Sequence, residues 1–415
     1  MSTVVALGSL LELSDSGVWG GEDETSGVSV LRSTNFNSDG SLDLSKLTFR
    51  VLEERNRERK LLRPGDILLE KSGGGRKQPV GRVCLFKGDV RPHSFGNFIA
   101  RLRPRESVLS EYLFYVLWHY HATGRTSQFQ KQTTGIRNLE FKRYLTIDVP
   151  VVSLEHQRRI VDLLSRAEGI VRLRREAQRK AAEIIPALFL DMFGDPATNP
   201  KGWEEVTLGQ VIASADYGSS TKAIDEGPGL PMIRMGNVDY AGNLDLSDLK
   251  FVQLPDDEGI RYRLEKGDLL FNRTNSKDLV GKTGLWEGEI EAIAASYFIR
   301  VRVDRNKVNP LYVWAFMNTP HMKHVFFETA RGAIGQANIN AKELRAFRIP
   351  VPPIDLQLQF DGRSRRLQAI ERQQRAAAVT ADATFNALLG RVFLVANGST
   401  ATEHKVKVAS AWPIT

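Results

Sequence analysis

The chain repeats itself after about two hundred residues, and this repeat limits its possible folds more than any other feature. The segment VLRSTNFNSDGSLDLSKL, from Val30, resembles MIRMGNVDYAGNLDLSDL, from Met232, and the shared residues stay in register at an offset of 202. Farther on, Phe98-Ile99 aligns with Phe298-Ile299 at an offset of 200. So many ordered matches indicate a tandem duplication, and both copies should therefore adopt one fold.

Each copy runs into a polar, arginine-rich segment whose apolar residues recur at steps of three and four, which is typical of an amphipathic helix. A helix from Glu155 to Phe193 would be roughly 58 Å long at 1.5 Å per residue. Because a helix with one apolar seam is unstable alone, it needs a partner, and the obvious one is its own repeat. Pro186 has no proline counterpart in the second copy and predicts a kink or break in the first helix.

Within each copy, short β-rich runs such as GDILLEK and GDLLFNR alternate with Gly/Asn/Asp turns and precede one or two helical stretches. The predicted fold class is α/β: two pseudo-symmetric α/β domains, each with a curved, mixed sheet, joined by two long antiparallel helices that form a coiled coil. We expect the first domain over residues 1–152, the first long helix over 153–194, a linker and the second domain over 195–352, the second long helix over 353–396, and a disordered tail over 397–415.

The composition favours a polyanionic partner, because 57 Lys and Arg against 49 Asp and Glu give a formal net charge of +8. No apolar run reaches the roughly 18 residues of a membrane span and no signal-peptide pattern opens the chain, so we expect a cytoplasmic protein. Cys84 is the single cysteine, which excludes an intrachain disulfide and any multi-cysteine metal site. We expect neither a cofactor nor a metal.

A specific resemblance lies in the segments around the long helices. The proline-bearing end of each copy (VPVVS, IPVPP), the glutamine-bearing helix start LEHQRRIVDLL and the sequence LFLDMFGDPATNPKGW resemble the specificity (S) subunit of type I restriction–modification systems, over nearly all of Leu7 to about Phe393. The resemblance implies two target recognition domains, each reading one half of a bipartite, asymmetric site on double-stranded DNA. It also implies that the helices act as a spacer and dock two methyltransferase (M) subunits, and through them restriction (R) subunits, with adenine as the modified base.

Two loops in each copy are candidates for DNA contact. The first follows each GD(I/L)L strand, and its glycines, basic residues and amides suit base edges, although a solvated surface turn would look the same. The candidates there are Lys71, Ser72, Arg76, Lys77 and Gln78 in the first copy and Asn272, Arg273, Thr274, Asn275 and Lys277 in the second. The second loop precedes the closing strand, where capping and turn formation are the alternative role. Its candidates are Lys131, Thr133, Thr134 and Arg137, then Arg331 and Gln336.

Other polar residues have simpler explanations. We interpret Arg32 and Arg234 as structural partners of Asp43 and Asp245, and the arginines of the first long helix as a solvated face.

Two motifs favour an enzyme only superficially. NPLY, from Asn309, has leucine where amino-methyltransferases have a second proline, and VGKTG, from Val280, lacks the first glycine of a phosphate loop. His321 and His324 have no obvious third metal ligand. We therefore predict a non-catalytic DNA-recognition subunit. The alternatives are a coiled-coil scaffold with two protein-binding domains, which would show no DNA sequence preference, and an enzyme in its own right.

Overall fold

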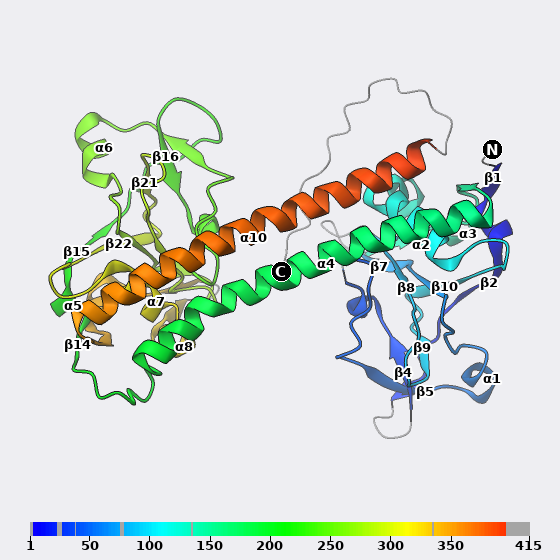
Figure 1. Cartoon of the computed structure of the whole chain (residues 1–415), viewed down its shortest axis with the longest axis horizontal. Coiled ribbons are helices and arrows are strands. Elements are labelled where there is room, and N and C mark those ends of the chain that lie inside the picture. Colours follow the sequence, from blue (N-terminus) through cyan, green and yellow to red (C-terminus); the bar gives the residue numbers. More distant parts are fainter. Residues whose placement is uncertain are drawn as a thin grey trace. The chain divides into compact units, whose positions relative to one another are not determined.

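The computed structural model of the chain describes residues 3–22, 27–37, 39–74, 79–133, 136–333 and 336–395 (Figure 1). The chain divides into two compact units: one joins the residues up to Leu173 to those from Ala378 onwards, and the other runs from Arg174 to Ala377. Each unit thus contains one copy of the repeat and about half of each long helix. The tail predicted over 397–415 lies outside the described residues.

The first copy is rich in short strands. Its strands are β1 (Thr3–Ala6), β2 (Leu11–Ser16), β3 (Gly21–Glu22), β4 (Val28–Leu31), β5 (Thr48–Val51), β6 (Ile67–Glu70), β7 (Ser72–Gly74), β8 (Val83–Leu85), β9 (His93–Phe95), β10 (Ile99–Pro104), β11 (Gln130–Thr133), β12 (Ile136–Leu139) and β13 (Asp148–Val151). Its helices are α1 (Glu54–Arg57), α2 (Ser110–Ala122), α3 (Phe141–Tyr144) and the 3-10 turns η1 (Leu7–Leu10), η2 (Ser33–Asn35) and η3 (Arg125–Phe129).

The second copy follows the same order after the first long helix, α4 (Leu154–Phe193). Its strands are β14 (Glu205–Thr207), β15 (Ile212–Tyr217), β16 (Leu230–Ile233), β17 (Lys250–Val252), β18 (Leu269–Asn272), β19 (Thr274–Asn275), β20 (Thr283–Leu285), β21 (Ile293–Ala294), β22 (Phe298–Val303), β23 (Arg331–Ala333), β24 (Gln336–Asn338) and β25 (Arg348–Pro350). Its helices are α5 (Leu208–Val211), η4 (Met235–Asn237), α6 (Asp256–Tyr262), α7 (Pro310–Met317), α8 (Pro320–Thr329), α9 (Ala341–Ala346) and the second long helix, α10 (Ile354–Val395).

In the described part of the chain, each copy contains four small sheets. One of them, called the large sheet below, is antiparallel and four-stranded, with strand order β2-β10-β6-β8 in the first copy and β15-β22-β18-β20 in the second. Around it lie the pairs β1-β13 and β14-β25, the sheets β11-β12-β7 and β19-β24-β23, and the sheets β3-β5-β4-β9 and β17-β16-β21. The α/β class is confirmed, but the single curved sheet is wrong, because strands of two to six residues end at turns before one sheet can extend across the copy.

The strand registers correct one part of the repeat alignment. Glu70 of β6 lies opposite Ile99 of β10, whereas Asn272, its equivalent in β18, lies opposite Phe298 of β22. Ile99 is therefore equivalent to Phe298, one residue away from the alignment read from the sequence. Both side chains are fully buried. Because side chains alternate between the faces of a strand, a shift by one residue would have turned one of them to the opposite face.

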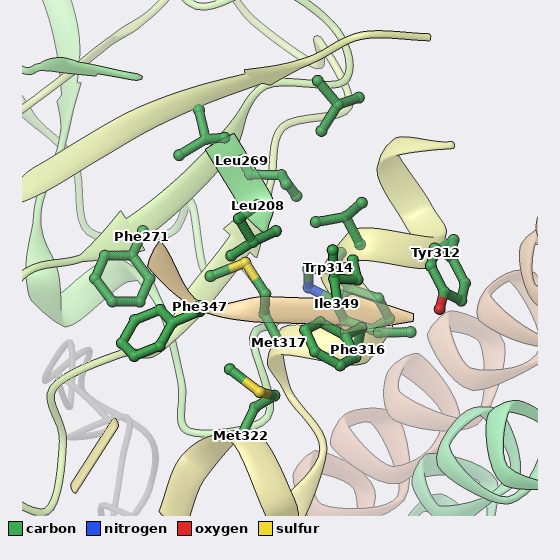
Figure 2. Close-up of a cluster of buried hydrophobic side chains, with 14 of the residues drawn as sticks. Leu208, Leu269, Phe271, Tyr312, Trp314, Phe316, Met317, Met322, Phe347 and Ile349 are labelled. Atoms are coloured by element: carbon green, nitrogen blue, oxygen red, sulfur yellow. The ribbon is translucent and has the colours of Figure 1, made fainter. Parts of the chain in front are cut away.

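The main core of each copy forms between its large sheet and the helix that follows that sheet in the chain. Figure 2 shows this core in the second unit, where Phe271 of β18 and Phe316 of α7 belong to one buried cluster. α7 starts with a proline, and the Asn309 side-chain oxygen accepts the N–H groups of Leu311 and Tyr312 at 2.8 and 3.3 Å. Full burial of each such aromatic side chain contributes about 1.5–3 kcal/mol.

The long helices α4 and α10 pack against each other in antiparallel directions (Figure 1). In the first unit, Leu164 and Val171 of α4 share a buried cluster with Phe385 of α10. In the second unit, the rings of Phe189 and Phe360 meet at 5.9 Å between centroids. The start of each helix thus packs beside the end of the other, as predicted, and both join the core of the copy beside them.

A buried glutamine ties the start of each long helix to its own copy. Gln157 accepts the backbone N–H of Leu109 at 2.8 Å and donates to the carbonyl of Val152 at 2.8 Å. Gln357 makes the same two bonds, at 2.8 and 2.7 Å, with the backbone at the two equivalent positions. Both glutamine side chains are fully buried, and in the second unit the backbone groups that they satisfy are buried as well.

The helix α4 is not broken at Pro186, which lies inside its 40 residues. Proline removes one helix hydrogen bond, but its neighbours Ile185 and Phe189 are buried in the core of the second unit, and this packing offsets the loss. Among the described residues, neither this helix nor any other combines the length and the apolar composition needed to cross a bilayer.

Candidate nucleic-acid interface

The two candidate loops of each copy come together in one small sheet. In the first copy, β7 from the first loop pairs with β12, and β11 completes the sheet. In the second copy, β19 pairs with β24 in the same way, and β23 completes the sheet. We call these the first and second hairpin sheets. Segments about 65 residues apart along the chain are thereby joined at one place in each copy.

Equivalent residues occupy equivalent places in the two hairpin sheets. In the first, Asn138 lies between Ser72 and Lys131 on the neighbouring strands. In the second, Asn338 lies between Thr274 and Arg331. Directly opposed residues project from the same face of an antiparallel sheet. The first sheet therefore carries a row of one hydroxyl, one amide and one basic residue, all able to donate hydrogen bonds to phosphate or base oxygens.

The side chains of the first hairpin sheet are partly engaged with one another. The Ser72 hydroxyl donates to the Asn138 side-chain oxygen. Lys131 is largely exposed and pairs with Glu140 at 2.5 Å, and this hydrogen bond lowers the pKa of the Glu140 carboxyl. Lys71, just before β7, is half-buried, and desolvation lowers the pKa of its ammonium. Arg137 is half-buried on β12.

At the second hairpin sheet, the Arg273 side chain contacts both an aromatic ring and an amide. The Arg273 guanidinium lies 4.7 Å from the centroid of the Tyr217 ring and donates to the Asn338 side-chain oxygen at 3.3 Å. Asn272 is fully buried and Thr274 nearly so, which favours a structural role for these two side chains. By contrast, Asn275 is half-buried and Lys277 is exposed.

Several candidate residues have no described side chain. Arg76, Lys77, Gln78 and Thr134 lie outside the described residues. For Thr133, Arg331 and Gln336 the structure describes the backbone but not the side chain. The basic candidates with described side chains are therefore Lys71, Lys131, Arg137, Arg273 and Lys277.

Three exposed aromatic residues beside the hairpin sheets were not among the residues predicted from the sequence. Phe98 and Tyr297 are 46% and 42% exposed, and their carbonyls accept the N–H groups of Lys71 and Arg273, both at 2.9 Å. They occupy the same structural position in the two copies. The corrected register would have revealed this pair, since it aligns an aromatic residue with an aromatic residue. Tyr217, the third, is the ring beneath Arg273.

The pairing proposed for the repeated arginines is wrong. Arg234 bonds to Asp248 at 3.1 Å, whereas Asp245 accepts the N–H of Ser247, and Asp43 likewise accepts that of Ser45. The two aspartates cap a tight turn, because their short side chains reach a backbone N–H two residues ahead.

Several arginines of the first long helix form local ion pairs. Arg159 pairs with Glu155, and Arg166 pairs with Asp162. The partners of each pair lie one helical turn apart, and both side chains are exposed. Such exposed pairs contribute about 0.3–0.5 kcal/mol each, which fits a solvated helix face.

The motifs that resemble enzymes have structural roles. Asn309 of NPLY caps α7, and Lys282 of VGKTG donates to the backbone carbonyls of Met235 and Val238 at 2.9 and 2.6 Å. Within the described ranges, no group of three or more His, Cys, Asp or Glu residues is arranged to hold a metal ion, and this includes the surroundings of His321 and His324.

A duplicated α/β fold on paired long helices, with a polar, basic hairpin sheet in each copy, defines a class of two-site recognition proteins. A family model described as the type I restriction modification DNA specificity domain matches this chain twice, over residues 24–182 and 200–360. These matches cover more than half of the chain. The chain belongs to this family: it is a DNA specificity subunit of a type I restriction–modification system, the non-catalytic component of such a complex.

Individual relatives agree with this assignment. The EcoKI specificity subunit of Escherichia coli K12 is 24% identical over 388 residues, which are 88% of this chain and 81% of that protein. A putative MjaX specificity subunit of Methanocaldococcus jannaschii is 29% identical over 163 residues, 39% of this chain and 38% of that protein.

Solved structures share the fold. The S subunit from M. genitalium superposes with a TM-score of 0.54 at 15% identity, covering 95% of this chain and 96% of that one. A chain from a structural study of assembly and conformational transition in a type I system gives 0.54 at 18% identity, covering 94% and 97%. At these identities the likeness concerns the fold alone.

Proposed function

We propose that the chain reads a bipartite, asymmetric site on double-stranded DNA, with one hairpin sheet at each half-site. The observation that carries the proposal is the convergence of both candidate loops into the same small sheet in both copies. A row of hydroxyl, amide and basic side chains suits both base edges and phosphates. The contacting residues proposed are those predicted from the two loops, apart from the buried Asn272 and Thr274, whose role would be to support the others.

The two half-sites are expected to differ in sequence. Lys71 of the first copy stands where the second has Arg273, and Ser16 stands where the second has Tyr217. A lysine presents a mobile point charge, whereas arginine presents a planar fork that matches guanine. Because the backbones are equivalent and the side chains differ, the copies should read different bases.

The long helices would fix the spacing between the two half-sites and dock the partners. In this proposal the recognition domains are residues 1–152 and 195–352, and the helical segments 153–194 and 353–396 act as a ruler. Uninterrupted helices of 40 and 42 residues support it. Partner methyltransferase subunits, and restriction subunits through them, would bind this helical region in the cytoplasm, where the complex modifies adenine. Leu163, Ile170 and Leu173 of α4 are 46–61% exposed and offer an apolar surface for such docking.

Footprinting of the assembled complex tests the proposal. The expected result is two short protected segments separated by a constant, unread spacer, with binding that weakens steeply as salt rises because phosphates are neutralised. Uniform protection without sequence preference would contradict it and would favour the scaffold alternative.

A further inference from the structure

The second hairpin sheet holds one guanidinium in a fixed orientation. The backbone N–H of Arg273 donates to the carbonyl of Tyr297, and its carbonyl accepts the N–H of Ile339, both at 2.9 Å. Its side chain lies over the Tyr217 ring and donates through one terminal nitrogen to Asn338. Backbone and side chain are therefore both restrained, so that little conformational freedom remains to be lost when a ligand binds.

This guanidinium retains hydrogen-bonding capacity. Arginine has five N–H donors, and only one bond, to Asn338, is made to a described residue. The Nε atom is buried and has no hydrogen-bond partner in the described part of the chain, so the donors available to a ligand are the remaining N–H groups of the two terminal nitrogens. No carboxylate of a described residue lies within ion-pair distance, in contrast to Arg300 and Arg302 of the neighbouring sheet, which pair with Asp216 and Asp268.

We propose that Arg273 reads a guanine in the half-site bound by the second copy, and that Tyr217 and Asn338 are positioning residues that hold its guanidinium. The inference rests on the proposed function and names one base within it. A planar fork with unused donors matches the O6 and N7 acceptors that guanine presents in the major groove. Stacking on tyrosine fixes the plane of the fork, which bidentate recognition of a base requires and attraction to a phosphate does not.

The first copy lacks this arrangement. Lys71 and Ser16 stand at the positions of Arg273 and Tyr217, so neither the guanidinium nor the ring beneath it is present at these positions. The contact is therefore expected in one half-site only.

The test pairs a protein substitution with a single-atom change in the DNA. The chain, assembled with its methyltransferase, is titrated against duplexes carrying its methylation motif, in which each guanine of either half-site is replaced in turn by 7-deazaguanine, which lacks N7. The complex with the unaltered chain should lose affinity by about tenfold at one guanine, the order expected for a specific base contact. Arg273→Ala should bind more weakly and should no longer respond to the change at that guanine.

Matched variants separate positioning from folding. Arg261→Ala is the control: Arg261 also stacks on a tyrosine, Tyr262, at 5.4 Å, but at the end of α6, outside the hairpin sheet. It should leave both affinity and guanine discrimination unchanged. Tyr217→Phe keeps the ring and should retain the discrimination, while Tyr217→Leu should lose most of it with an unchanged melting temperature.

Several outcomes would overturn the inference. One is an Arg273→Ala variant that keeps its sensitivity to 7-deazaguanine. Another is an Arg273→Ala variant that loses affinity equally for every duplex, as loss of a phosphate contact would produce. The inference would also be overturned if the half-site read by the second copy contained no guanine. If the complex with the unaltered chain shows no sequence preference, the proposed function itself fails, a result distinguishable from the others because it needs no variant.

Discussion

Replacing Gln357 by methionine tests how the second long helix is anchored to its copy. Gln357 is fully buried, and its side chain accepts the N–H of Asn309 at 2.8 Å and donates to the Pro352 carbonyl at 2.7 Å. Methionine has a similar volume but makes neither bond. Each buried backbone group left without a hydrogen-bond partner costs about 1–3 kcal/mol. Gln357→Met should therefore lower the free energy of unfolding of the second unit by about 2–6 kcal/mol.

Gln157→Met should cost less than Gln357→Met, because the corresponding hydrogen bonds in the first unit are only partly buried.

Hydrogen exchange measured by mass spectrometry is the assay, since it reports the stability of each unit separately where a single melting curve would not. Amide exchange should accelerate at the start of α7 and in the first turns of α10, and change little in the first copy. Gln359→Met is the matched control, because Gln359 is exposed on the same helix; its effect should stay within about 0.5 kcal/mol. If Gln357→Met exchanged no faster than Gln359→Met, the anchoring role would be refuted.

Four further predictions concern the pH dependence of stability in each unit, DNA contact and spacing. Burial lowers the pKa of His119 and His121 to about 4, so protonation of the unfolded chain should destabilise the first unit as pH falls from about 6.5 towards 4, by about 3 kcal/mol for each histidine, measurable by denaturant titration. Lys323, whose pKa burial lowers to about 7, should make the second unit more stable as pH rises from about 7 towards 10.5, and Lys323→Met should abolish that rise. Phe98→Ala and Tyr297→Ala should each weaken DNA binding several-fold in a gel shift, with unchanged melting temperatures, because an exposed aromatic ring can contact a thymine methyl group in the major groove; unchanged affinity would exclude both rings from the interface. Four residues added to each long helix should lengthen the unread DNA spacer, as read by footprinting, by about two base pairs, since four helical residues rise about 6 Å and one base pair about 3.4 Å; an unchanged spacer would contradict the proposed role of the helices as a ruler.

The duplication and the paired helices could be predicted from the sequence, because both follow from patterns that extend over many residues. The offset between Val30 and Met232 and the apolar seam of α4 each involve many independent positions. The continuity of α4 through Pro186 could not be predicted, since it depends on packing of Ile185 and Phe189 against the second unit. Tertiary burial there outweighs a local helix-breaking preference.

The candidate site could be predicted only in part. The loop residues carry suitable chemistry, but their convergence depends on pairing between strands about 65 residues apart, which no local pattern encodes. The burial of Asn272 and Thr274 follows from the same pairing. The exposed pair Phe98 and Tyr297 was hidden by a one-residue error in alignment, which only the strand register corrects.

The central claim is that the two copies are interchangeable modules, each reading its own half-site. The most direct measurement is methylome sequencing of a host that carries the methyltransferase and a chimaera in which residues 208–351 are replaced by residues 7–151, after gel filtration has shown that the complex assembles. Because the helices are antiparallel, the account predicts that the asymmetric motif becomes a palindrome of the first half-site repeated in inverted orientation. An assembled chimaera that still methylates the original asymmetric motif would contradict it.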